Sequence, residues 1–254
     1  MKNAVLSCIQ QSVFKGRFLL GVIFVAAEVF LASTETLLDV FRSDNLLDYG
    51  FHGSFVLEAV RSDTIVFCLP IVCALPFAAS FVDDVKSGFI KLYIHRAGRR
   101  GYILGRALGC VVSGGLAVAL GLLLAYGAAA LVFLPMEAAP LPDAEPPGYF
   151  RELLSVCWRF FLSSGLWALA GLTLSSLMES RYIAYGAPFI LYYVLIILYE
   201  RYFDRMYILY PKEWLTPGEA WVLGAWSVTP LLLEIMAILT MIFGGAVKKK
   251  VSEL

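Results

Sequence analysis

The chain has 254 residues, of which 60% are hydrophobic and 16% charged, and its mean hydropathy is +0.78. A soluble globular domain has about 45–50% apolar and about 25% charged residues, so this composition excludes a disordered chain and argues against a soluble enzyme. Lys and Arg number 20 and Asp and Glu number 20, so the net charge is zero. A zero net charge gives no indication of a nucleic-acid partner.

Six apolar runs have the length of a membrane-spanning helix, which needs about 20 residues to cross the ~30 Å hydrocarbon core. In chain order they are 18–34, 64–82, 107–136, 160–178, 182–199 and 220–247. Lipid offers no hydrogen-bond partner to the backbone, so runs of this length must be helical. The sequence therefore predicts an all-α, polytopic membrane protein with six transmembrane helices in one transmembrane domain, 1–254.

The distribution of Lys and Arg predicts the orientation, because basic residues in short connections stay on the cytoplasmic side. We assign the N-terminal segment, the 83–106 connection, the 179–181 turn and the C-terminal tail to one side. This side has 13 basic and 4 acidic residues, whereas the other has 7 basic and 14 acidic residues. We therefore expect a multi-pass protein with both termini in the cytoplasm.

The segment 1–17 has a weakly amphipathic pattern. Its apolar residues Val5, Leu6, Ile9 and Val13 fall within about a 100° arc of a helix. The pattern predicts an interfacial helix before the first span. A partly ordered cytoplasmic tail is an equally good interpretation.

The connection 83–106 contains the most informative pattern. Asp83 and Asp84 stand where a helix would begin and its dipole favours negative charge, and Gly98 stands where it would end. The apolar positions have helical spacing; they are Val85, Phe89, Leu92 and Tyr93. Such a helix either docks its apolar ridge into the groove of a partner or lies at the membrane surface, where Lys and Arg hold lipid headgroups.

This connection resembles the loop between the second and third spans of type-2 ABC exporter permeases. In that family two acids, a glycine, a coupling helix, an Arg-containing turn and a Gly-Lys pair follow one another. The residues at comparable positions are Asp83, Asp84, Gly88, Arg99, Tyr102, Gly105 and Arg106. The departures are Asp in place of Glu and Arg106 in place of Lys. The resemblance extends to the layout of the chain, with a cytoplasmic N-terminal segment, six spans and an outer segment before the last one.

The resemblance implies a permease subunit in a prokaryotic plasma membrane, which pairs with a second, identical or related permease. It also implies that two copies of an ATP-binding subunit dock on residues 83–100 and drive the outward transport of a hydrophobic or amphipathic cargo, such as a peptide, an antibiotic or a lipid-like molecule. The docking residues implied are Asp83, Asp84, Lys86, Gly88, Phe89, Leu92, Tyr93, Arg96, Arg99 and Arg100. The chain lacks the G-x-x-x-x-G-K-[ST] sequence that binds phosphates, so ATP and Mg²⁺ are expected on the partner. We expect no cofactor and no catalytic residue in this chain.

Glu28 and Glu234 are the two acids inside expected spans. A charge at the centre of a span costs about 2.5–3.5 kcal/mol on insertion scales. Each carboxyl group therefore either lines a cargo path or subunit interface, or is protonated and bonds a neighbouring helix. His52 and His95 stand alone in the sequence, and no cluster has metal-ligand spacing, so no metal site is expected.

Other functions stay open at this point. A membrane protein of this layout could sequester a toxin as an immunity or sensor protein, and sequence does not separate this function from export. An integral-membrane enzyme is disfavoured by the lack of a catalytic constellation. A vitamin-capture subunit is disfavoured because its cytoplasmic loops are short, whereas 83–106 is long.

Overall fold

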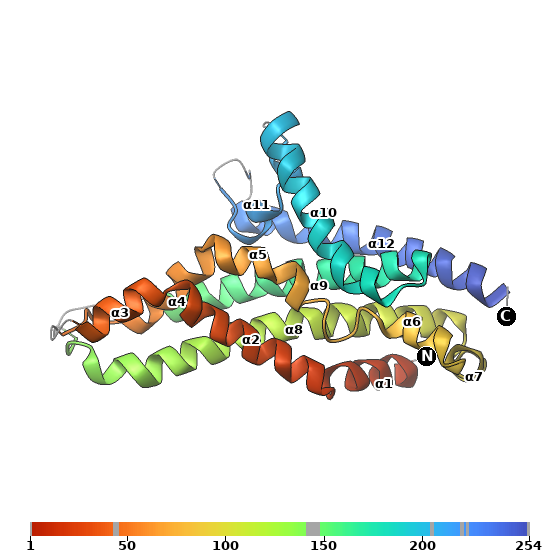
Figure 1. Ribbon diagram of the computed structural model, residues 1–254, viewed down its shortest axis with the longest axis horizontal. Helices are drawn as coiled ribbons and strands as arrows, with labels where there is room; N and C mark the ends of the chain where they lie inside the picture. Colours follow the sequence, from red (N-terminus) through yellow and green to blue (C-terminus); the bar gives the residue numbers. More distant parts are fainter. Residues whose placement is uncertain are drawn as a thin grey trace.

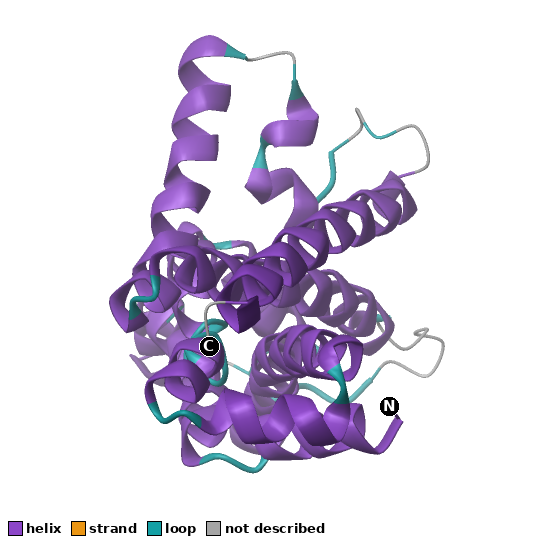
Figure 2. Ribbon diagram, turned by 90° about the vertical axis from the view of Figure 1, so that its right-hand side faces the viewer, coloured by secondary structure: helices purple, strands orange, loops and turns teal. Residues whose placement is uncertain are grey.

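The computed structural model describes residues 2–42, 46–140, 148–203, 206–218, 221 and 224–252, without the side chains of residues 2–4, 95, 224 and 225. Within these ranges the regular structure is helical, and one isolated bridge joins Leu47 to Glu137. Figure 2 shows the helices and the loops that connect them. The prediction of an all-α protein is therefore confirmed for the described part of the chain.

The helices have the following bounds. They are α1 (Lys2–Val13), α2 (Gly16–Ala32), α3 (Thr34–Arg42), α4 (Phe51–Arg61), α5 (Asp63–Val72), α6 (Ser80–Lys86), α7 (Phe89–Ala97), α8 (Arg99–Phe133), α9 (Tyr149–Met178), α10 (Arg181–Tyr202), α11 (Pro211–Leu215) and α12 (Val228–Ser252). Short 3₁₀ turns lie at Leu134–Met136, Tyr207–Leu209 and Gly224–Ser227.

Four helices in the described ranges are long and apolar enough to cross a membrane: α8 with its 3₁₀ extension, α9, α10 and α12. The pair α2 and α3 also passes this test as one segment, but its axis bends by 61°. On α10, whose C-terminal part stands away from the bundle in Figure 1, apolar side chains such as Ile190 are exposed. Exposed apolar helices of this length need lipid or a partner around them, which supports a membrane-embedded protein. The count of six spans is not confirmed.

The expected span 64–82 is not a continuous helix. Helix α5 ends at Val72 after ten residues, a length of ~15 Å and about half of the hydrocarbon core. Turns occupy residues 73–79, and α6 follows. Pro76 explains the break, because a proline ring clashes with the carbonyl group four residues earlier, here that of Val72.

Other helices differ from the predicted runs at their ends. Helix α8 begins at Arg99 rather than 107, and α9 begins at Tyr149 rather than 160. Helix α12 begins at Val228 rather than 220. For α8 and α9, hydropathy detects only the apolar part of the helix, whereas the backbone hydrogen bonds continue into the polar turn at its start. Helix α12 is instead shorter than its apolar run, because a 3₁₀ turn at Gly224–Ser227 precedes it.

Helices α8 and α9 form the centre of the bundle. Helices α1, α2 and α4 pack on α8, α10 packs on α9, and α12 contacts both (Figure 1). Small residues allow this close approach: a Cβ atom at Gly115 would lie 2.6 Å from the carbonyl oxygen of Phe161. This is the packing by small residues that membrane helices commonly use.

The two ends of the bundle differ in the segments that they hold. Figure 1 shows α1, α6, α7 and the C-terminal end of α12 at one end, and α3 and part of α4 at the other. We call the first the basic end and define it as residues 2–17, 83–106 and 248–252. The N-terminal, 83–106 and C-terminal segments, which the charge distribution assigns to one side, thus lie together.

Candidate functional site

The segment 83–98 folds at the basic end into the end of α6 and a separate helix, α7. Gly88 and Gly98 flank α7 with φ angles of +70° and +72°. Glycine adopts these left-handed angles at the lowest cost, and Gly88 therefore separates the two helices. The expectation of one helix starting at Asp83 is wrong, because Asp83 and Asp84 belong to α6.

Helix α7 exposes part of its apolar surface. Ile90 is fully buried, whereas Leu92 keeps 72% and Phe89 keeps 42% of its surface exposed. The side chains of Lys86, Lys91, Arg96, Arg99 and Arg100 are also exposed around it, as is Gly88. Leu92 and Phe89 therefore form an apolar ridge that is open to another molecule and has basic residues around it.

Behind α7, a buried ion pair joins α6 to α8. Arg106 Nη2 lies 2.5 Å from Asp84 Oδ2, and the Tyr102 hydroxyl donates a hydrogen bond of 2.7 Å to the same oxygen. The Arg106 and Asp84 side chains are only 2% and 11% exposed. Burial raises the pKa of Asp84 above its ordinary value, although Arg106 and Tyr102 oppose this shift. Asp84 is thus a positioning residue rather than one that a partner could reach.

The same guanidinium group contacts segments distant in sequence. It lies 5.1 Å from the ring centre of Phe77 and 5.6 Å from that of Tyr102, which are cation–π distances. Its Nη1 atom also lies 3.5 Å from the side-chain oxygen of Gln11 on α1. Arg106 therefore joins α1, the 73–79 turns, α6 and the start of α8.

Tyr93 attaches α7 to the same assembly. Its hydroxyl lies 3.5 Å from the Cys8 sulfur of α1, and its ring packs against that of Tyr102 at 5.9 Å. On its other side, the ring stacks on Phe89 at 5.3 Å. Helix α1 is confirmed as a helix, but it packs along α8 with Cys8 buried and Leu6 exposed. Its position in a membrane interface stays a prediction.

Asp83 points to a different neighbour from Asp84. Its carboxylate lies 2.5 Å from Arg181 Nε at the start of α10, and both side chains are partly exposed. Next to this pair, Arg17 Nη1 donates a hydrogen bond of 3.1 Å to the Tyr185 hydroxyl. Exposed ion pairs contribute little to stability, so separating Asp83 from Arg181 would cost little free energy.

The two intramembrane acids lie in different environments. Glu28 is buried on α2, its Oε1 atom has no hydrogen-bond partner among the described residues, and its carboxyl group interacts with Cys68 of α5. Glu234 is exposed on α12, whose buried face includes Leu232 and Met236. Glu28 thus faces the inside of this chain, whereas Glu234 faces away from it.

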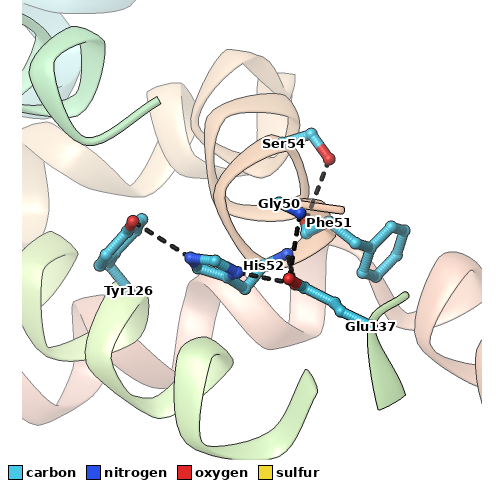
Figure 3. Close-up of polar contacts among 6 residues, drawn as sticks. All are labelled: Gly50, Phe51, His52, Ser54, Tyr126 and Glu137. Atoms are coloured by element: carbon cyan, nitrogen blue, oxygen red, sulfur yellow. Dashed lines mark hydrogen bonds and ion pairs between the residues drawn. The ribbon is translucent and has the colours of Figure 1, made fainter. Parts of the chain in front are cut away.

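At the opposite end of the bundle, His52 and Glu137 form a cluster that the sequence did not reveal (Figure 3). The Glu137 carboxylate accepts hydrogen bonds from the backbone N–H groups of Gly50 and His52, at 3.0 and 2.8 Å, and contacts His52 Nδ1 at 2.7 Å. The other ring nitrogen lies 3.2 Å from the Tyr126 hydroxyl. His52, which stands alone in the sequence, thus has two side-chain partners in the fold. The side chain of His95 lies outside the described residues.

The cluster predicts how acid affects this end. Burial would raise the pKa of Glu137, but the hydrogen bonds from His52 and Gly50 outweigh it and lower the pKa below its ordinary value. The ionised Glu137 therefore stabilises the folded state fully above the ordinary pKa of glutamate, near 4.3. This stabilisation is lost as the pH falls through the lower pKa that Glu137 has in the folded protein.

Replacing Glu137 with Gln is expected to loosen this cluster at neutral pH, because the hydrogen bonds lose their charged acceptor. Bonds to a charged group contribute about 1.5–3 kcal/mol, so the amides of Gly50 and His52 should exchange with deuterium roughly 10- to 100-fold faster. Glu152→Gln is the control, since its pair with Arg61 is exposed. Equal exchange at Gly50 and His52 in both variants would contradict the prediction.

At the basic end, the sequence pattern identified Asp83 and Asp84 but not the residues that contact them. Tyr102 and Arg106 are one helical turn apart, which places both on one face of α8, and this spacing was an available signal. Nothing local identifies Gln11, Phe77 or Cys8 as their neighbours.

A scan against models of known protein families finds no match for the chain, and a search of curated proteins finds none either.

Proposed function

We propose that this protein is the permease subunit of an ATP-driven ABC exporter and that a separate ATP-binding subunit docks on α7. One observation carries the proposal: α7 exposes Phe89 and Leu92 at the basic end while its other face is fixed to α8. A helix-in-groove contact needs an exposed apolar ridge with charged residues on either side. The resemblance of the 83–106 connection to that of type-2 ABC exporter permeases places ATP and Mg²⁺ on the partner.

The contacts behind α7 support a mechanical link. A partner that moves α7 would also move α8, because Tyr93 packs on Tyr102 and the neighbouring Asp84 is paired with Arg106. Helix α8 has 35 residues and is therefore ~50 Å long, enough to carry a displacement across the membrane. ATP-driven closure of the partner would tilt α8 and open a path for a hydrophobic or amphipathic cargo.

The proposal includes the membrane arrangement. We propose six crossings: the α2 region, then residues 64–82, which hold α5, the turns at 73–79 and the start of α6, and finally the apolar parts of α8, α9, α10 and α12. Both termini then lie in the cytoplasm of a prokaryotic cell, and the exporter contains two permeases, identical or related. Glu234 faces outward on α12, which makes it a candidate for the contact with the second permease.

Leu92→Asp is expected to separate the permease from its ATP-binding partner. A charge in an apolar contact loses the burial of Leu, worth about 1.5–3 kcal/mol, so the amount of partner retained should fall at least tenfold. The measurement is the ATP-binding subunit and ATPase activity that co-purify with the tagged protein from its native membrane.

The matched control is Leu6→Asp, which introduces the same charge on an exposed leucine of α1 at the same end. It should keep the partner at the wild-type level. A wild-type complex without any ATP-binding subunit would overturn the proposal, and so would equal losses for the two variants.

A further inference from the structure

A groove between the first turns of α8 and the last turns of α12 lies at the basic end, apart from the ridge of α7. It encloses about 540 Å³, within the range of small-molecule sites. Ile103 and Leu104 line it from α8, and Met241 lines it from α12. The lining is mostly apolar, which suits a hydrocarbon chain.

Two glycines keep the groove open on the α12 side. A Cβ atom at Gly245 would meet no atom within 4 Å, and one at Gly244 would only touch Ile103 at 3.7 Å. Thr240, Gly244 and Lys248 are spaced by four residues and lie on one face of α12. From Thr240 to Lys248 the groove follows α12 for ~12 Å, close to the ~15 Å depth of one membrane leaflet.

The charged residues of the groove lie where α8 begins and α12 ends, and all of them are positive. Arg100 and Lys248 both line it, and no Asp or Glu of the described part of the chain does. Among the described side chains neither of the two has an ion-pair partner. Two cations beside an apolar channel are complementary to a molecule with a negative headgroup and a hydrocarbon tail.

We propose that this groove binds an acidic phospholipid, with its phosphate between Arg100 and Lys248 and one acyl chain along Met241 and Gly245. Basic pockets between membrane helices are known to hold anionic headgroups. The amphipathic lining separates this occupant from a free phosphate, which would leave the apolar channel empty. The proposal does not depend on an ATP-binding partner.

The test uses the full-length protein in detergent, titrated with phosphatidylglycerol, with phosphatidylcholine of the same chains, or with glycerol 3-phosphate. Bound lipid is counted by native mass spectrometry. Each cation near an anionic lipid contributes about fivefold in affinity, so Arg100→Gln with Lys248→Gln should weaken phosphatidylglycerol binding about thirtyfold. Phosphatidylcholine binding should fall far less in this variant, because the choline group offsets the charge of its phosphate.

A second variant tests the apolar part. Gly245→Leu places its Cβ atom where no atom lies within 4 Å. It should fill the groove and weaken both lipids, while the unfolding temperature without lipid stays at or above that of the wild type. The control pair Arg99→Gln with Lys249→Gln removes the same charge beside the groove and should retain binding within about twofold. An equal loss of phosphatidylglycerol binding in the Arg100/Lys248 and Arg99/Lys249 double variants would overturn the proposal. So would equal affinity of the wild type for both lipids, equally tight binding of glycerol 3-phosphate, or a second copy that occupies the groove in place of lipid.

Discussion

Replacing Arg106 with Met is expected to destabilise the protein by about 3–5 kcal/mol, the usual cost of leaving one member of a buried ion pair without its partner. Among the described residues, the Asp84 carboxylate would then keep only the Tyr102 hydroxyl as a hydrogen-bond donor. The guanidinium contact with Phe77 would also be lost. Denaturant unfolding in a fixed detergent, followed by tryptophan fluorescence, measures the loss.

The double variant Asp84→Asn with Arg106→Met separates the charge effect from the packing effect. It removes both charges but keeps an oxygen that accepts the Tyr102 hydrogen bond. Replacing a whole buried pair is often nearly neutral, so the double variant should be more stable than Arg106→Met alone. The single variants Asp84→Asn and Arg106→Met are measured as well. If the stability lost by the double variant equalled the sum of their two losses, the side chains would not be coupled and the contact behind α7 would be misassigned.

The pH dependence of Arg106→Met follows from the burial of Asp84. Burial raises the pKa of this carboxyl group, and Arg106 opposes the rise in the wild type. Without Arg106 the folded pKa rises further above the unfolded value. The defect should therefore be full above the folded pKa and shrink as the pH falls toward the unfolded value near 3.9, where both states are protonated. A defect that is constant with pH would assign it to lost packing alone.

The helices show which parts of the fold could be predicted from the sequence and which could not. The long apolar helices α8, α9, α10 and α12 follow from composition, because backbone groups in lipid must bond within the helix. Pro70 and Pro76 indicate a kink in 64–82, but hydropathy averages over Pro76 and does not show that its missing N–H group accompanies the end of the helix. The separation of α6 from α7 depends on the left-handed φ of Gly88, which a count of apolar spacing does not detect.

The polar contacts illustrate a different limit. Asp84 and Arg106 stand 22 positions apart, and His52 and Glu137 stand 85 apart, so no local pattern connects either pair. For the first pair, the one-turn spacing of Tyr102 and Arg106 indicates that the two lie on one face of α8, but it does not identify Asp84 as their partner. For the second, the fold alone brings the residues together, through the bridge between Leu47 and Glu137. Long-range pairing of this kind needs the packing of α4 on α8, which a single sequence does not encode locally.

Gly171→Ala is expected to destabilise the protein by about 1–3 kcal/mol through overpacking between α9 and α10. A Cβ atom at Gly171 would collide with the carbonyl oxygen of Ala184 and would lie 3.0 Å from the Pro188 ring and 3.3 Å from Ala78 Cβ. The first obstacle is backbone in the middle of a helical turn, so relief requires a shift of α10 itself. Heat-induced unfolding of the variant in the detergent used for the wild type measures the effect.

Gly186→Ala is the matched control, because it adds the same methyl group one helix away where no atom lies within 4 Å. Alanine is favoured over glycine inside a helix by about 0.5–1 kcal/mol, so this variant should equal or exceed the wild type in stability. Opposite signs for the two substitutions would show that the approach of two backbones, rather than the helix propensity of glycine, fixes α10 against α9. Equal stabilities would mean that α10 can move away from α9 at no cost, and the tight contact at Gly171 would then not hold the bundle together.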